Sequence, residues 1–330
     1  MRRQAEAGID VVCDGEMSRE GMHYIREHME CFGGEAKEPR RGSDLAAHPD
    51  AAVRLRAQSD GFEHMRAPAC TGAIKYRDLE WLNTDIATFR AALDASPAQE
   101  GFITVTSPGT IAQIIENQHY ETREAYLMAL ADAVKVQCDA IIDAGFLLQV
   151  DACDLAMEYH FAFQDLPRER AHELLELNVE AYNRAIADVP SDKLRLHICW
   201  GNYSGPHTYD VPVAEIMDLI LASRAGAITF PAANPRHEHE WRVWEQADIP
   251  SDVVLIPGVI DTLAPIVEHP ELVADRIERW ANVVPRENVM PSTDCGFGTF
   301  VGLSAVAPSV AYEKLAALGA GARIASERLF

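Results

Sequence analysis

Short apolar runs rich in β-branched residues alternate with helix-like stretches along almost the whole chain. The runs are IDVVCD, ACTGAI, FITVTS, FLLQVD, LRLHIC, AITFPA, VVLIPGVID and NVMPSTDC. They are continuously apolar, which is typical of strands that are covered on both faces. Such strands, separated by helices, indicate a parallel sheet with crossover helices. The pattern therefore predicts an α/β fold, and a (β/α)8 TIM-like barrel fits it best.

The stretches between the runs include four strong helix candidates. They are REAYLMALADAVKVQCDAIIDAG, RERAHELLELNVEAYNRAIADV, VAEIMDLILASRAG and PELVADRIERWANVV. One segment, about 31–68, breaks the rhythm because it is charged, rich in Gly and Pro, and without a clear strand. We expect a single barrel domain over 1–330, with this segment as an excursion over the barrel mouth.

Length and charge restrict the class of partner. The 330 residues suit one large barrel, and 51 acidic against 29 basic residues give a formal net charge of -22. A surface this acidic would repel phosphate backbones and anionic lipid headgroups, so we expect neither nucleic acid nor membrane as a partner. The polar start lacks the features of a signal peptide, which predicts a cytoplasmic protein. Seven cysteines without a Cys-x-x-Cys pair predict reduced thiols.

Polar residues follow several apolar runs at the points where the strands are expected to end. In a parallel barrel the carboxyl ends of the strands form the active-site face, so these residues are expected to share one face. They are Asp14 and Glu16 after the first run, Ser107 and Thr110 after the third, Asp151 and Asp154 after the fourth, His197 and Cys199 after the fifth, and Asp294 and Cys295 after the last.

His197, Cys199 and Cys295 are the candidates for a metal site. His197 and Cys199 are two positions apart, so their side chains point to the same side of a strand. One imidazole and two thiols form a soft donor set that favours zinc over magnesium or calcium. Taken singly, each residue is more typical of a buried core position. Their shared place at strand ends favours a zinc site that keeps one position open for a substrate.

Several motifs carry a resemblance to a known family. HICWGN, STDCGFGT about a hundred residues later, VCDGEMSREGMHYI near the start and LLQVDACDLAM between them resemble the catalytic domain of cobalamin-independent methionine synthase. CWGNYSGPHTYDVP and AANPRHEHEW are similar to the short single-barrel branch that includes epoxyalkane:coenzyme M transferase. The resemblance covers nearly the whole chain. It implies a barrel of the methionine synthase/uroporphyrinogen decarboxylase type with Zn²⁺ as cofactor.

The resemblance also implies roles for single residues. His197, Cys199 and Cys295 match zinc ligands, and Glu16 and Asp151 match acidic residues that hold the amino group of homocysteine. The implied chemistry is the transfer of a methyl or other alkyl group to a small-molecule thiol. Zinc would hold that thiol as a nucleophilic thiolate at neutral pH.

Four further residues complete the expected site. Asp154 is expected to help orient an ammonium group, and Ser107 is placed with it among the substrate-binding residues. His207 is expected to supply a proton, with Tyr209 as the alternative donor, and Asp294 is a second catalytic candidate. For the carboxylates, the competing interpretation is that they cap the helices that follow.

Three departures from the family pattern limit what the resemblance implies. Pro231 stands where the family usually has a glutamate as the fourth zinc ligand, so Glu238, His237 or solvent must replace it, or the site is weakened. Leu263 lies near the place of a histidine proton donor in the synthases, which puts methyl-folate activation in doubt. The chain begins at the helix before IDVVCD, so either the first barrel strand is missing or the start is misplaced.

Three functions are compatible with these features. The leading one is zinc-dependent transfer of a methyl or other alkyl group to a thiol such as homocysteine. The second is addition of a thiol to an epoxide, which needs no folate. The third is a barrel that binds zinc or a thiol without turnover. The thiol, the alkyl donor and the oligomeric state, including a homo-oligomer, stay open.

Overall fold

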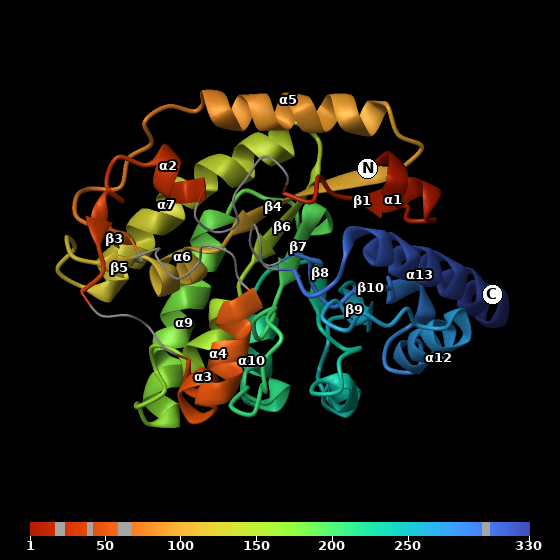
Figure 1. Ribbon diagram of the computed structural model, residues 1–330. Coiled ribbons are helices and arrows are strands. Elements are labelled where there is room, and N and C mark those ends of the chain that lie inside the picture. Colours follow the sequence, from red (N-terminus) through yellow and green to blue (C-terminus); the bar gives the residue numbers. More distant parts are fainter. Residues whose placement is uncertain (17–23, 38–41, 59–67, 299–303) are drawn as a thin grey trace.

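The computed structural model describes residues 1–16, 24–37, 42–58, 68–298 and 304–330 (Figure 1). Its main sheet has seven strands in the order β1-β4-β6-β7-β8-β9-β10, and each pairing is parallel. The predicted α/β fold is therefore confirmed, as a curled sheet of the expected barrel type. The strands are β1 (Val11–Val12), β4 (Glu100–Thr106), β6 (Leu147–Asp151), β7 (Leu194–His197), β8 (Ala227–Phe230), β9 (Val254–Ile260) and β10 (Ser292–Thr293).

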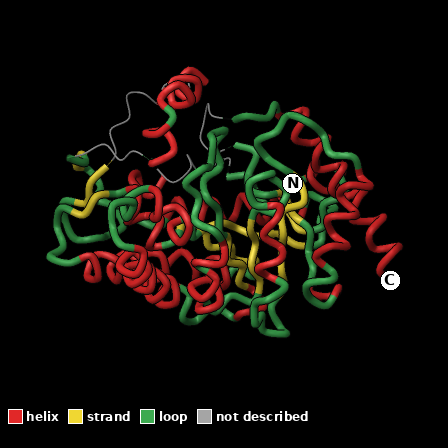
Figure 2. Tube along the Cα trace, turned by 90° about the horizontal axis from the view of Figure 1, so that it is seen from below, coloured by secondary structure: helices red, strands yellow, loops and turns green. Residues whose placement is uncertain are grey.

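Helices flank the strands on both sides of the sheet (Figure 2). The four strong helix candidates form α7, α9, α10 and α12. Capping side chains define two helix starts. Ser107 accepts a hydrogen bond from the Thr110 backbone N–H at the start of α6, and Thr122 accepts one from the Ala125 backbone N–H at the start of α7. The helices are α1 (Arg2–Glu6), α2 (Tyr24–His28), α3 (Ser43–Ala47), α4 (Pro49–Gln58), α5 (Glu80–Asp94), α6 (Pro108–Ile114), α7 (Arg123–Asp143), α8 (Asp154–Met157), α9 (Arg168–Ala185), α10 (Met217–Ala222), α11 (Trp241–Trp244), α12 (Pro270–Trp280) and α13 (Pro308–Leu329).

The run ACTGAI does not join the main sheet, contrary to the prediction. It contributes to β3 (Pro68–Cys70), which pairs with β2 (Gly34–Glu35) and β5 (Glu116–Asn117) in a separate three-stranded sheet. Among the described residues the main sheet therefore has seven strands instead of eight. The reason is that a continuous apolar run reports burial, and β3 is buried throughout, but burial does not specify which sheet a strand joins.

The segment 31–68 contains regular structure where none was predicted. Its described part includes β2, α3 and α4, whereas residues 38–41 and 59–67 lie outside the described residues. The carboxylate of Asp44 in α3 accepts hydrogen bonds from the backbone N–H groups of Thr208 and Tyr209 at 2.9 and 3.2 Å. These contacts hold α3 against the loop that follows β7. A single domain over 1–330 stays a prediction.

Aromatic side chains connect the sheet to its outer helices. Phe230 at the end of β8 stacks on Trp244 of α11, with ring centroids 4.1 Å apart, and meets Trp280 of α12 edge-on at 5.1 Å. A second apolar cluster joins β9, α12 and α13 around Val259 and Ile277. These contacts pack α11, α12 and α13 against β8 and β9.

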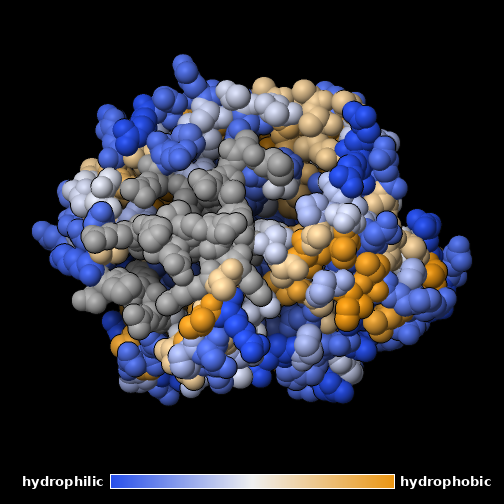
Figure 3. All heavy atoms as spheres, in the orientation of Figure 1, coloured by the Kyte–Doolittle hydropathy of each residue, from blue (hydrophilic) through white to orange (hydrophobic). Residues whose placement is uncertain are grey.

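One part of the surface is apolar. Figure 3 shows hydrophobic residues gathered on the side of the molecule that carries α12 and α13, and the loop before α12 exposes Ile266 and Val267. Among the described residues, no helix combines the length and the apolar character that crossing a membrane requires. The oligomeric state, including a homo-oligomer, stays open.

We expect Gly258→Ala to destabilise the protein by about 1–3 kcal/mol, the usual cost of overpacking. Gly258 lies in β9 opposite Ser292 of β10, and a Cβ atom there would meet Asp294 Oδ1 at 2.1 Å and Asp294 Cα at 2.6 Å. Because the second contact involves backbone, β10 has to move. Urea unfolding of the variant measures the effect. The control is Gly33→Ala, whose Cβ would meet nothing within 4 Å, and equal losses in both variants would contradict the prediction.

Candidate metal centre and the residues around it

The predicted site residues come from neighbouring strands of the main sheet. His197 ends β7 and lies in register with Asp151, which ends β6. The chain after β6 is also tied to His197, because the Ala152 backbone N–H donates to its carbonyl oxygen at 2.8 Å. Cys199 follows β7 by two residues, and Cys295 follows β10 by two. The parallel sheet thus brings the predicted metal ligands to its carboxyl edge.

His197, Cys199 and Cys295 form a compact group of donor atoms. One donor atom from each residue lies within 4.8 Å of the other two, and the Cys295 sulfur is 3.6 Å from His197 Nε2. Contact with the Cys153 thiol and burial raise the pKa of Cys199 well above its ordinary value. Contact with the Cys199 thiol and burial do the same for Cys295. A divalent cation would reverse this by stabilising the thiolates, so the donor set fits zinc.

Two predicted substrate-binding carboxylates lie at the same edge of the sheet. Glu16 follows β1, and its Oε1 accepts a hydrogen bond from the Thr104 hydroxyl of β4. Its φ of 55° is in the left-handed region, which is uncommon for a residue other than glycine. The carboxylate of Asp151 accepts a hydrogen bond from Gln149 at 2.9 Å. Their binding of substrate stays a prediction.

Asp154 and Ser107 belong to a buried hydrogen-bonded group. Asp154 is 1% exposed, and its Oδ1 accepts hydrogen bonds from the hydroxyls of Ser107 at 2.6 Å and Thr110 at 2.7 Å. Its Oδ2 accepts one from the side chain of Asn178 in α9 at 2.9 Å. These contacts join α8 to α6 and α9 and account for both residues without a substrate. Their role in substrate binding stays a prediction.

Asp294 holds the loop that follows β8. Its Oδ1 accepts hydrogen bonds from the backbone N–H groups of Ala232 and Ala233, both at 2.8 Å. Its Oδ2 accepts from the backbone and the side chain of Asn234 at 2.9 and 3.0 Å. Burial raises the pKa of Asp294 to about 6, although these hydrogen bonds act in the opposite direction. Because Cys295 comes next in the chain, the contacts also position that thiol; the predicted catalytic role of Asp294 itself stays a prediction.

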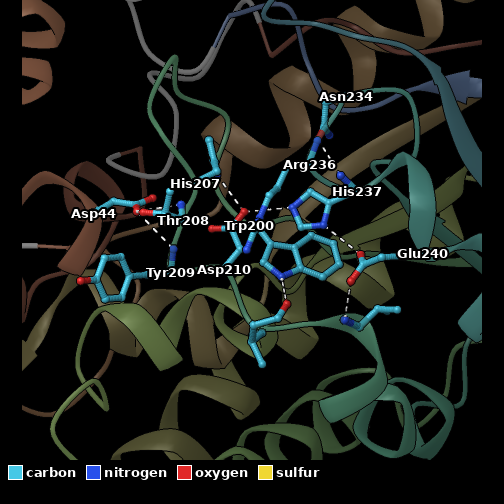
Figure 4. Close-up of polar contacts among 12 residues, drawn as sticks. Asp44, Trp200, His207, Thr208, Tyr209, Asp210, Asn234, Arg236, His237 and Glu240 are labelled. Atoms are coloured by element: carbon cyan, nitrogen blue, oxygen red, sulfur yellow. Dashed lines mark hydrogen bonds and ion pairs between the residues drawn. The ribbon is translucent and has the colours of Figure 1, made fainter. Parts of the chain in front are cut away.

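His207 and Asp210, in the loop after β7, form a chain of contacts with His237 and Glu240, which follow β8 (Figure 4). His207 Nδ1 and His237 Nε2 each lie 2.9 Å from Asp210 Oδ2, and His237 Nδ1 lies 2.9 Å from Glu240 Oε2. The other nitrogen of His207 lies 3.0 Å from the Tyr203 carbonyl oxygen. Burial lowers the pKa of both histidines, but the carboxylate contacts outweigh it and raise both pKa values. The carboxylates therefore favour the protonated form of both rings.

The residues named as replacements for the family's fourth zinc ligand have other partners. Both nitrogens of His237 face carboxylates, as described above. Glu238, in the 3₁₀ helix Glu238–Glu240, pairs with Arg276 and Arg279, each at 3.3 Å. Pro231 is buried and offers no side-chain donor. Because His237 and Glu238 already have partners, solvent is the remaining predicted replacement for the fourth zinc ligand.

The comparison with known proteins identifies the family. The model of the family described as "Cobalamin-independent synthase, Catalytic domain" matches residues 1–311. The chain belongs to this family. The predicted resemblance is therefore confirmed.

Individual proteins also match along nearly the whole chain. A methionine synthase of Saccharolobus solfataricus is 26% identical over 328 residues, covering 98% of this chain and 81% of that protein. A 2-hydroxypropyl-CoM lyase of Xanthobacter autotrophicus is 24% identical over 357 aligned residues, covering 99% and 84%. The structure of a B12-independent methionine synthase from Shewanella sp. W3-18-1, in complex with selenomethionine, has a TM-score of 0.72 and 20% identity, covering 99% of this chain and 85% of that one. The last similarity supports the fold.

The structure adds residues to this family member's site that the sequence analysis missed. The sulfur of Cys153 lies 3.1 Å from that of Cys199, and Cys153 is not among the predicted ligands. The sequence could have indicated Cys153, because it lies two residues after β6, and the predicted ligands were also chosen for their positions at strand ends. His237 and Glu240, three residues apart, form a buried ion pair that was not predicted from the sequence.

The alternative proton donor, Tyr209, lies beside a cavity instead of beside the thiols. Its side chain is 49% exposed. The cavity, of about 480 Å³, lies between α3 and the start of α9, and its lining includes Tyr209, Tyr159 and Arg168. His197, Cys199 and Cys295 are not among the residues that line it.

The raised pKa values of the two histidines predict how the stability of this family member depends on pH. Because the pKa of folded His237 lies above its ordinary value of 6.5, its ion pairs contribute fully below pH 6.5 and are lost as the pH rises through the folded value. We therefore expect the free energy of unfolding of the wild type to exceed that of His237→Gln most at pH 6, and this difference to shrink toward pH 9. Urea unfolding across this range measures it. A constant difference would show that His237 does not titrate there.

Proposed function

We propose that the protein is a zinc-dependent enzyme that transfers a methyl or other alkyl group to a small thiol. The observation that carries the proposal is the convergence of His197, Cys199 and Cys295 at one edge of a parallel sheet, with donor atoms within 4.8 Å of one another. Membership of the cobalamin-independent synthase family and relatives named methionine synthase support the same reaction class.

The residues of the chain would contribute in distinct ways. Zinc, when bound, supplies a positive charge that lowers the pKa of a thiol and keeps it nucleophilic. His197, Cys199 and Cys295 would hold it. Glu16 and Asp151, at the same edge, would bind an ammonium group and so orient an amino-acid thiol such as homocysteine.

A second reaction, addition of the thiol to an epoxide, has specific support. The 2-hydroxypropyl-CoM lyase of Xanthobacter autotrophicus matches 99% of this chain. The place of the synthases' histidine donor is near the apolar Leu263, whose backbone N–H donates to Asp261 at 2.8 Å. In this reaction the thiolate forms a carbon–sulfur bond, the epoxide carbon–oxygen bond breaks, and the oxygen takes up a proton. His207 would supply that proton from Nε2, after releasing the carbonyl oxygen of Tyr203.

The donor preference tests these alternatives. We expect methyltetrahydrofolate to be a poor donor compared with a simpler methyl donor or a strained epoxide, because the departing nitrogen of folate needs a placed acid. Steady-state rates would be measured with each donor, at saturating homocysteine or coenzyme M and with stoichiometric zinc. A rate with folate that exceeds the other two by a wide margin would contradict the prediction. Zinc binding without turnover on any donor would favour a binding protein instead.

A further inference from the structure

The thiol of Cys153 contacts the thiol of Cys199, one of the predicted zinc ligands. Its sulfur is 3.1 Å from that of Cys199, and the two residues are 46 positions apart. Cys153 lies two residues after β6 and immediately before α8, and β6 is the neighbour of β7, which ends in His197. Since a thiol is a weak hydrogen-bond donor, the contact gains little in the metal-free protein. The position of Cys153 beside a predicted zinc ligand indicates a role in metal binding.

The centre lacks an evident fourth side chain. His237 is held between Asp210 and Glu240, and Glu238 is held by two arginines. Pro231 contributes no donor. Cys153 is partly exposed, and it touches Cys199 from the side of β6. Among the described residues, Cys153 is therefore a fourth sulfur or nitrogen donor in contact with one of the three ligands.

We propose that Cys153 is a third sulfur ligand, so that the resting metal centre contains one histidine and three cysteines. The inference rests on the proposed zinc site. Cys153 stands outside the set of three whose donor atoms lie within 4.8 Å, so its side chain has to rotate when the metal binds. Three thiolates and one imidazole are a common tetrahedral set for zinc.

This ligand set has two measurable consequences. Each thiol that binds a divalent metal loses its proton, so metal binding releases one proton more if Cys153 takes part. Each thiolate also adds sulfur-to-metal charge-transfer absorption when Co²⁺ replaces zinc. Neither quantity depends on turnover, so both can be measured without knowing the substrate.

The experiment compares the wild type with Cys153→Ser, Cys199→Ser and Cys13→Ser, each stripped of metal and kept under a phosphine reductant. Serine suits position 153 because it is a favourable residue at the start of a helix. Cys13 is the matched control, since it also follows a strand of the main sheet but bonds through its backbone to Gln4. Co²⁺ titrations give the charge-transfer intensity and affinity, and calorimetry in buffers of different ionisation enthalpy gives the protons released.

For Cys153→Ser we expect about one third less charge-transfer intensity than in the wild type, one proton fewer released, and an affinity at least about 10-fold lower. Cys13→Ser should match the wild type in all three quantities. Values for Cys153→Ser equal to those of the wild type would overturn the inference and leave the three-ligand site intact. Failure of the wild type itself to bind Co²⁺ would instead overturn the proposed zinc site.

Discussion

Cys199→Ser is expected to remove stoichiometric zinc and catalytic activity together. Cys199 is 4% exposed and contributes one of the three donor atoms that lie within 4.8 Å of one another. A neutral hydroxyl is a much poorer zinc ligand than a thiolate. Because loss of an outer partner of a metal ligand already costs about 10–100-fold in affinity, we expect a loss of more than about 100-fold here. Competition with a chelator of known affinity measures it.

Cys138→Ser is the control for that experiment. Cys138 is fully buried in α7, and it is not in the group of donor atoms. Its replacement should leave zinc affinity unchanged, whatever it does to folding stability. A loss of zinc in Cys138→Ser as large as in Cys199→Ser would contradict the assignment of the ligands. Loss of activity in Cys199→Ser with zinc affinity intact would contradict the zinc role of that thiol.

Asp294→Ala should destabilise the metal-free protein by at least about 3 kcal/mol. The substitution leaves four N–H donors of Ala232, Ala233 and Asn234 without their acceptor, and each unsatisfied buried donor costs about 1–3 kcal/mol. Because Asp294 precedes Cys295, we also expect zinc affinity to fall by about 10–100-fold. Urea unfolding and metal competition provide the two measurements.

Two further variants test the cause of that effect. Asp294→Asn keeps one oxygen acceptor and should lose less stability than Asp294→Ala. Asp188→Ala removes an aspartate whose side chain is 78% exposed and pairs with Lys135, so this change should have little effect on stability. If Asp294→Ala were as mild as Asp188→Ala, the loop after β8 would not depend on the carboxylate.

The strand pattern of the sequence predicted most of the sheet. Seven of the eight apolar runs form strands of the main sheet. The prediction succeeded because a strand that is buried on both faces has to be apolar along its whole length. ACTGAI satisfies the same condition in the small sheet, so the pattern could not separate the two. The edge of the sheet at which His197, Cys199 and Cys295 gather was predicted for the same reason, because parallel strands end on one side.

The identity of the soft donors and their place at strand ends were determined by the sequence alone, because both depend on residue type and local periodicity. Only the tertiary structure decided which polar groups are already occupied. Asp154 and Asp294 both follow strand ends, as predicted. Their carboxylates, however, accept hydrogen bonds from residues between 24 and 62 positions away. The approach of Cys153 to Cys199 likewise depends on strand order and register. The physical reason is that hydrogen bonding and metal binding require atoms to meet within a few ångströms, and distant segments reach such distances only after the sheet and its helices have packed.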